Sequence, residues 1–156
     1  MIQSVSKLKS KFQEINIRDT INSGQVFLWE KKRDKWYGID GEKILVIDEK
    51  TREFRKNNDE FYFFRQNDNF EEILSYLKKD KVVKKALSTF PGIRLLRQDP
   101  FQCYISFIVS SNSNIPNIKT RLQNLCKKFG KQKKTESKEF FIFPEAKVIA
   151  KASISD

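Results

Sequence analysis

The sequence predicts an α+β fold in which an antiparallel sheet precedes a set of helices. Between residues 15 and 54, short apolar runs are separated by turn-forming residues, which is typical of strands. From Asn69 onward, apolar side chains recur at intervals of three and four residues, which is typical of helices. Strands in one part of the chain and helices in the next indicate the α+β class rather than alternating α/β. The 14 Phe residues supply apolar volume for a folded core.

Three strands are expected in the first part of the chain. Val26–Trp29 is apolar throughout, and Trp36–Ile39 and Ile44–Ile47 follow it. Asp40-Gly41 predicts a type I′ hairpin between the last two strands, because both central residues of that turn must tolerate positive φ. Lys31–Asp34 is expected to form the preceding turn, which makes the strands an antiparallel meander.

Two short helices are expected next. Residues 70–77 form an apolar stripe at helical spacing that ends in Lys78-Lys79. Residues 82–90 repeat this spacing until Pro91-Gly92 stops it. We predict that residues 91–98 connect this unit to the next.

Two further helices are predicted to meet at a polar corner. Asp99 suits an N-cap, with Pro100 at the first helical position, where its missing N–H costs nothing. Apolar side chains cover so much of residues 101–109 that we expect this helix to be largely buried. It ends at Ser110–Asn114, five small polar residues, and Pro116 begins the second helix.

The last part of the chain is predicted to carry an apolar patch. The second helix is expected to end at Gly130, which suits a C-terminal cap. Lys131–Lys138 is predicted to be a basic loop. An apolar patch follows, and Pro144 opens a final helical stretch. The patch consists of Phe140, Phe141 and Phe143.

Composition excludes several classes of enzyme. The chain has no His, which removes Ser-His-Asp and Cys-His catalysis and most zinc sites. Its two cysteines are too few for a disulfide framework or an all-cysteine zinc site. No Gly-rich phosphate-binding motif of the GxxxxGK[ST] or GxGxxG type occurs. We therefore expect neither a metal nor a cofactor.

The charge indicates a polyanionic partner. A net charge of +11 and a pI near 9.6 suit nucleic acid or an anionic membrane surface, although many Lys-rich chains are merely soluble. No basic amphipathic helix with an exposed apolar face supports the membrane alternative. No apolar run approaches the roughly 20 residues that span a bilayer, and Met1–Gln13 lacks the apolar centre of a signal peptide. We expect a soluble intracellular protein, located in the cytoplasm and nucleoid or in the nucleus.

Two polar turns are candidates for nucleic-acid contacts. Ser110–Asn114 precedes a helix whose first N–H groups attract phosphate, and Asn side chains can hydrogen-bond to base edges. The alternative is that these residues only form a turn and cap the second helix. In Asn22–Gln25, Gly24 permits a backbone conformation or a close approach that other residues forbid, and an ordinary turn before a strand is again the alternative.

Both turns lie in stretches that resemble the 8-oxoguanine DNA glycosylase/AP lyase family of the eukaryotic type. Ser23–Trp29 (SGQVFLW) resembles that family's SGQxFxW motif, and Gly92–Pro100 (GIRLLRQDP) resembles GVRLLRQDP. Ser106–Ile115 (SFIVSSNSNI) resembles SFICSSNNNI, and Leu125–Gly130 (LCKKFG) continues the match in the same order. The resemblance covers the N-terminal half of the family.

This resemblance implies a partner and a site. The family excises 8-oxoguanine from double-stranded DNA in base-excision repair, after flipping the damaged purine into a pocket. It implies that the Gly24 carbonyl accepts the N7–H that 8-oxoguanine has and guanine lacks. It also implies that Asn112 fills the gap left by the flipped base and contacts the opposite cytosine. Ser113 and Asn114 complete the family's Asn triplet, and Asn117 stands where the family has a cytosine-reading Arg. The departures at Ser113 and Asn117 argue against a strict preference for cytosine.

The resemblance also implies an architecture. Residues 1–92 are expected to form an antiparallel sheet with flanking helices, a TATA-binding-protein-like domain. Residues 93–156 are expected to form the first helices of a helix-hairpin-helix glycosylase domain. The family's catalytic Lys, GVG hairpin and assisting Asp have no match, so we assign no catalytic residue and expect the chain alone to be inactive. The alternatives are a non-enzymatic DNA-binding module and one half of a split glycosylase, completed by a separate C-terminal chain docked on the Phe patch.

Overall fold

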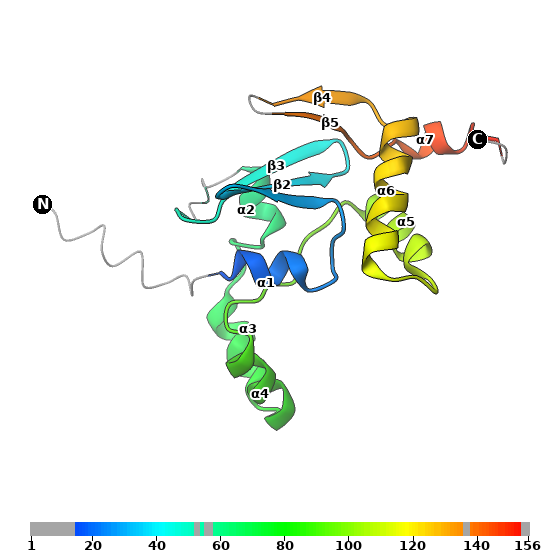
Figure 1. The fold of residues 1–156 in the computed structure, drawn as a ribbon. Helices are drawn as coiled ribbons and strands as arrows, with labels where there is room; N and C mark the ends of the chain where they lie inside the picture. Colours follow the sequence, from blue (N-terminus) through cyan, green and yellow to red (C-terminus); the bar gives the residue numbers. More distant parts are fainter. Residues whose placement is uncertain (1–14, 52–53, 55–57, 136–137, 154–156) are drawn as a thin grey trace, which may run out of the picture. The chain divides into compact units, whose positions relative to one another are not determined.

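The computed structural model describes residues 15–51, 54, 58–135 and 138–153 (Figure 1). The prediction about Met1–Gln13 lies outside these residues. The chain forms two compact units. The first unit comprises Met1–Gln25 and Thr51–Arg97, and the second comprises Val26–Lys50 and Gln98–Asp156. Each unit combines two segments that are far apart in sequence, whereas the expected domains, 1–92 and 93–156, are continuous. The boundary between residues 92 and 93 therefore stays a prediction.

The first unit begins with a helix that the sequence patterns do not predict. Residues 15–22 are expected to be extended, but α1 (Ile17–Asn22) is helical. Asn16 caps this helix, because its side-chain oxygen accepts a hydrogen bond from the Asp19 N–H at 2.9 Å. Ile17, Thr20 and Ile21 lie on one buried face at helical spacing. A cap and one turn of apolar spacing therefore override the strand-like composition.

The remaining helices of the first unit are α2 (Asp59–Phe63), α3 (Phe70–Leu77) and α4 (Lys81–Thr89). The two helices predicted over residues 70–77 and 82–90 are confirmed. Each has a side-chain cap, and the Asp80 carboxylate accepts from the N–H groups of Val82 and Val83 at 2.7 and 2.9 Å. The short α2 is not predicted, because five residues are too few to display a period.

The connector after α4 is an extended segment held within the first unit by backbone hydrogen bonds. The Asn16 N–H donates to the Gly92 carbonyl at 2.9 Å, and the Arg97 N–H donates to the Phe63 carbonyl at 2.9 Å. Between them, the Arg94 N–H donates to the buried Thr20 hydroxyl at 3.2 Å. The segment therefore packs like a strand, although it belongs to no sheet.

The second unit contains the predicted three-stranded sheet, in the order β1-β2-β3 with antiparallel neighbours (Figure 1). The strands are β1 (Trp29–Lys32), β2 (Lys35–Asp40) and β3 (Lys43–Asp48). The limits predicted for the first strand are wrong, because it begins at Trp29 and continues through Lys32. Since Lys32 pairs with Lys35, the turn is Arg33-Asp34 alone.

The turn between β2 and β3 differs from the predicted type I′ hairpin. Asp40 pairs with Lys43, so the two central residues are Gly41 and Glu42. Of these, only Gly41 has a positive φ, at +57°. A positive φ at the first central position alone is the pattern of a type II′ turn. The predicted position is therefore shifted by one residue.

The second unit continues with α5 (Pro100–Ser110) and α6 (Ile115–Phe129). The predicted capping residues are confirmed, because Asp99 is the N-cap of α5 and Gly130 is the C-cap of α6. The expectation that α5 is largely buried is wrong. Its buried residues are the polar Gln102 and Ser106, whereas Tyr104, Phe107 and Ile108 are 62%, 73% and 50% exposed. When most of a helix surface is apolar, the sequence pattern does not show which face packs against the rest of the protein.

The end of the second unit is a small hairpin followed by a short helix. β4 (Gln132–Lys134) pairs antiparallel with β5 (Glu139–Phe141), where a basic loop is predicted. The predicted Phe patch is wrong, because Phe140 and Phe143 are 7% and 2% exposed and only Phe141 reaches the surface, at 37%. A final helix, α7 (Ala146–Ile149), follows Pro144 as predicted.

One core unites these parts of the second unit. Phe140 stacks on Tyr37 with ring centroids 5.7 Å apart, and α6 contributes apolar side chains from its inner face. The buried members of this core are Leu28, Tyr37, Ile39, Ile118, Leu122, Cys126, Phe140 and Phe143. Over the part of the chain that the structure describes, no helix is long and apolar enough to span a bilayer.

Candidate DNA interface

The corner between α5 and α6 presents polar side chains at the surface. Asn112 has a left-handed backbone conformation, with φ at +51°, and is exposed. Asn is one of the residues that tolerate this conformation. Asn114 is the N-cap of α6, because its side-chain oxygen accepts from the Asn117 N–H at 3.0 Å. The capping role is therefore real for Asn114, whereas the Asn112 side chain makes no such cap.

Ser113 differs from its neighbours in this corner. Its hydroxyl oxygen is buried and has no hydrogen-bond partner among the described residues. In this conformation the hydroxyl is directed away from solvent, so a base edge could not reach it. The side chains of Asn114 and Asn117, in contrast, belong to exposed residues.

The two helices beside this corner carry only positive charge. Residues 100–130 contain no Asp or Glu. All four cations lie on α6, which has no acidic residue in its first turn. They are Lys119, Arg121, Lys127 and Lys128. Lys119 and Arg121 lie in the first two turns of α6, so a polyanion approaching this corner meets positive charge on the nearer half of that helix.

Gly24 lies in the first unit, in the turn that follows α1. Its φ of +86° is a conformation that L side chains rarely adopt, and no atom of any residue beyond its two chain neighbours lies within 4 Å of the position that a Cβ would occupy. Glycine is therefore required by backbone conformation rather than by crowding. The backbone at this turn faces open space, which leaves room for a ligand to approach it.

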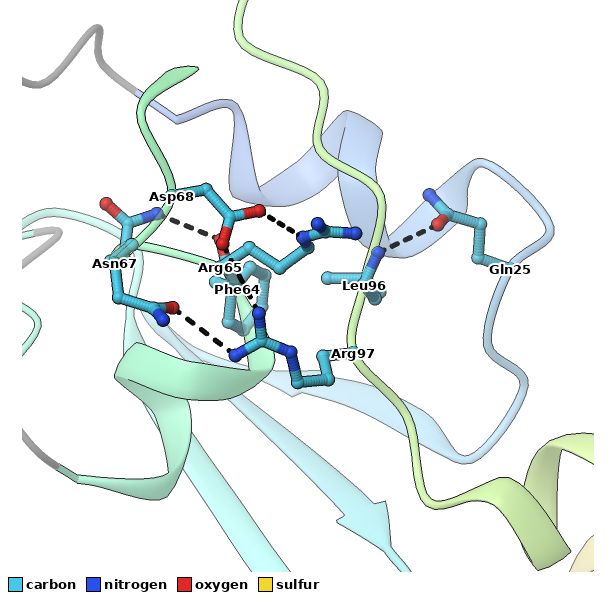
Figure 2. Close-up of polar contacts among 8 residues, drawn as sticks. Gln25, Phe64, Arg65, Asn67, Asp68, Leu96 and Arg97 are labelled. Carbon is cyan, nitrogen blue, oxygen red and sulfur yellow. Dashed lines mark hydrogen bonds and ion pairs between the residues drawn. The ribbon is translucent and has the colours of Figure 1, made fainter. Parts of the chain in front are cut away.

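Gln25 fastens this turn to the extended connector (Figure 2). Its side-chain oxygen accepts from the Leu96 N–H at 3.0 Å, and its amide nitrogen donates to the Arg94 carbonyl at 2.9 Å. The same nitrogen lies 2.8 Å from the Ser23 hydroxyl. Gln25 therefore forms hydrogen bonds with a backbone N–H and a backbone carbonyl of a segment about 70 residues away in sequence. Sequence reasoning missed Gln25 as a site residue, although it lies within the SGQ motif.

A pocket of about 290 Å³ lies beside Gln25 in the first unit. The Arg94 guanidinium lies over the Phe70 ring, 3.2 Å from its centroid, and the residue is only 6% exposed. Burial lowers the pKa of Arg94 to about 10, which leaves it charged at neutral pH. Nearby, Asp68 bridges Arg65 and Arg97 at 2.5 and 3.3 Å (Figure 2).

The predicted site residues are divided between the two units. Gly24 belongs to the first unit, and the other four belong to the second. The structure brings those four together in one corner, at residues 112–117. Their contacts with DNA stay predictions. Within the described ranges, no group of three or more His, Cys, Asp or Glu side chains could hold a metal ion.

Comparison with known proteins identifies the family. Residues 7–104 match the family model described as 8-oxoguanine DNA glycosylase, N-terminal domain. A stretch of 39 residues is 51% identical to N-glycosylase/DNA lyase of Saccharomyces cerevisiae (strain ATCC 204508 / S288c), covering 25% of this chain and 10% of that protein.

Solved structures extend the similarity over nearly the whole chain. The 8-oxoguanine glycosylase/lyase of Clostridium acetobutylicum in its apo-form has a TM-score of 0.80 and 28% identity, covering 94% of this chain and 54% of that one. Its complex with dsDNA containing cytosine opposite to 8-oxoG has a TM-score of 0.79 and 29% identity, with 92% and 53% covered. MBOgg1 in complex with a low affinity DNA ligand gives the same four values. The chain spans about half the length of these relatives. With its N-terminal domain matched by the family model and its fold shared with these enzymes, the chain belongs to the 8-oxoguanine DNA glycosylase family.

Proposed function

We propose that this chain is the damage-recognising part of a DNA glycosylase/AP lyase that excises 8-oxoguanine in base-excision repair. The observation that carries the proposal is the α5–α6 corner, where an exposed Asn112 in a left-handed conformation lies beside a helix with four cations and no acid. An amide side chain can hydrogen-bond to an orphaned base while the cations bind phosphates.

Lesion selectivity is assigned to Gly24. Its turn is open to solvent on the side where a Cβ would lie, so a base edge can approach the backbone closely. A backbone carbonyl at this position accepts the N7–H of 8-oxoguanine. Normal guanine carries a lone pair at N7, so two acceptors would face each other and the contact would be lost.

Opposite-base selectivity is assigned to Asn112, supported by Asn114 and Asn117. Asn117 offers a short amide rather than the forked guanidinium that reads cytosine bidentately. We therefore expect the four opposite bases to differ less in affinity than they would with an Arg at this position.

A binding experiment tests the assignment. Duplexes that contain 8-oxoguanine opposite each of the four bases are compared with an undamaged duplex by fluorescence anisotropy. Asn112→Ala is expected to weaken lesion binding about tenfold, equivalent to ~1.4 kcal/mol. The matched control is Asn124→Ala, which alters an exposed Asn in the middle of α6 and leaves affinity unchanged. Equal affinities of the damaged and undamaged duplexes would contradict the proposal.

Catalysis is proposed to need residues that this chain lacks. No segment resembles the family's catalytic Lys with its GVG hairpin and assisting Asp, so no amine is placed for attack on the sugar C1′. We expect no covalent adduct when the 156-residue chain is treated with borohydride in the presence of lesion-containing DNA. A trapped adduct would show that the chain supplies its own nucleophile.

A non-enzymatic DNA-binding module is the second candidate, and the net charge of +11 favours it. Such a module binds through phosphates, so its affinity falls steeply with salt and is the same for damaged and undamaged DNA. Affinity that stays constant from 50 to 200 mM salt would exclude it. A preference for 8-oxoguanine that persists at the higher salt favours the glycosylase assignment instead.

A further inference from the structure

The outward face of α5, formed by Tyr104, Phe107 and Ile108, is apolar and exposed. These residues follow the i, i+3, i+4 spacing of one helical face, at 62%, 73% and 50% exposure. On the opposite side, Gln102 and Ser106 are 4% and 8% exposed. Phe101, Ile105 and Val109 are partly buried against the core of the second unit. The helix therefore has apolar side chains on both faces, and only the inner ones are covered.

The buried Gln102 explains why this orientation is fixed. Its amide nitrogen donates to the Ile39 carbonyl at 2.8 Å, and its side-chain oxygen accepts from the Gly41 N–H at 2.7 Å. Rotation of α5 to bury the Phe107 side would break both hydrogen bonds and leave two backbone groups unsatisfied. The exposed face is thus a consequence of specific contacts within the second unit.

The character of this face favours a protein partner over nucleic acid. α5 contains no charged residue, in a chain of which a third of the residues are charged. Lys and Arg supply most of the electrostatic affinity for a phosphate backbone, and α5 has neither. Adjacent large apolar side chains without charge are typical of the centre of a protein–protein or interdomain contact.

The length of the relatives indicates the occupant. The solved glycosylases match 92–94% of this chain, but the match covers only 53–54% of their own length. Nearly half of each relative is therefore polypeptide with no counterpart among these 156 residues. This missing part is a source of apolar surface of the required kind.

We propose that the outward face of α5 is the docking surface for that remaining part of the glycosylase. The occupant is a polypeptide segment with an apolar helical face, and Phe107 is the central contact. This inference rests on the proposed function only in that the complete enzyme requires the missing segment. The docking surface is α5, and it replaces the Phe140–Phe143 patch predicted from sequence.

A chimera tests the docking. The chain is joined to the segment of the Clostridium acetobutylicum glycosylase/lyase that lies outside its match, and chimera and chain are each made as native, Phe107→Lys and Asn124→Lys forms. In the isolated chain, both substitutions are expected to leave the Tm within about 1 °C. In the chimera, Phe107→Lys is expected to lower the Tm by about 5 °C or more, because a cation is forced into an apolar contact. Asn124→Lys is the matched control for added charge on an exposed helix position.

The exposed Cys103 provides a second readout next to this face. Any cysteine of the added segment is changed to Ser, and the rate at which Cys103 reacts with a disulfide reagent is measured. Docking is expected to slow this reaction on the order of tenfold in the chimera, because access of the reagent is blocked. The Phe107→Lys substitution is expected to restore the fast rate.

Three results would overturn the proposal. The first is an equal change in Tm from Phe107→Lys and Asn124→Lys in the chimera, together with a Cys103 that reacts as fast as in the isolated chain. A chimera that does not fold gives this same result. Another is a large loss of Tm from Phe107→Lys in the isolated chain, which would mean that the chain itself covers the face. The third is a dimer of the isolated chain in analytical ultracentrifugation that Phe107→Lys dissociates, since the occupant would then be a second copy. None of these measurements uses DNA, so failure of lesion recognition leaves them unaffected.

Discussion

The side-chain oxygen of Gln25 accepts a hydrogen bond from the backbone N–H of Leu96 at 3.0 Å (Figure 2). The amide nitrogen of the same side chain donates to the Arg94 carbonyl at 2.9 Å. One side chain thus satisfies a donor and an acceptor of an extended segment, as a neighbouring strand would. The relationship couples the turn that contains Gly24 to the connector between the chain's two units.

Replacing Gln25 with Leu is expected to destabilise the chain. The change removes both hydrogen bonds and leaves the part-buried Leu96 N–H and Arg94 carbonyl without this partner, at a cost of about 2–3 kcal/mol. Urea unfolding followed by circular dichroism measures the loss. The control is Gln123→Leu, which makes the same change at an exposed position of α6 and should shift stability by less than about 0.5 kcal/mol. Equal effects of the two substitutions would show that the Gln25 bonds contribute nothing.

Gln102 makes a similar pair of bonds in the second unit, and its replacement by Glu yields a pH-dependent prediction. A carboxylate still accepts from the Gly41 N–H but repels the Ile39 carbonyl, to which the amide nitrogen donates. A protonated carboxyl restores a donor. Gln102→Glu is therefore expected to destabilise the chain by about 2–3 kcal/mol at pH 7.5 and by clearly less at pH 4.5. Unfolding of the variant and of the native chain at both pH values measures the difference, and a penalty that does not change with pH would contradict the assigned bonds.

The elements that could be predicted from sequence are those whose local signals agree. α5 and α6 have N-cap residues, a Pro in the first turn and apolar spacing, and all of these point to the same limits. α1 could not be predicted, because its single turn competes with the β-branched composition around it. Which face of α5 is buried could not be predicted from sequence either. It depends on the contacts of Gln102 with the β2–β3 turn, which join residues about 60 positions apart.

In the candidate site, too, some residues could be predicted from local sequence and others depend on contacts with distant segments. Gly24 and Asn112 could be selected because a family motif contains them, and both have the positive φ that such turns favour. Gln25 could not be assigned a role, although it lies in the same motif. Its function depends on the backbone of Leu96, and sequence patterns carry no information about which distant segment a side chain meets.

Glu145 is expected to contribute a pH-dependent part of the stability of the second unit. Lys131 and Lys147 each lie 2.5 Å from it, and their hydrogen bonds lower its pKa from the ordinary 4.5 to about 2. A depressed pKa in the folded state means that the stabilisation is present above about pH 4.5 and is lost as the pH falls toward 2. Glu145→Gln is expected to remove this dependence. The stability difference between native chain and variant should therefore shrink between pH 5 and pH 2.5 in urea titrations.

A control separates this effect from general acid unfolding. Glu71→Gln alters an exposed carboxylate of α3 in the first unit. It is expected to leave the acid limb of the stability profile as in the native chain. An identical pH profile for Glu145→Gln and Glu71→Gln would exclude the Lys131–Glu145–Lys147 cluster as the source.

The two cysteines are expected to differ in reactivity because of their positions in the second unit. Cys103 is exposed on α5, whereas Cys126 is 2% exposed in the core, where burial raises the pKa of its thiol to about 12. The thiolate is the reactive form, so Cys126 is both inaccessible and protonated at pH 8. Titration with Ellman's reagent should give one fast thiol per native chain and two after unfolding in guanidinium. Cys103→Ser should abolish the fast phase, and Cys126→Ala should retain it. A fast thiol that persists in Cys103→Ser would mean that α6 opens readily and that its inner face does not form a stable core.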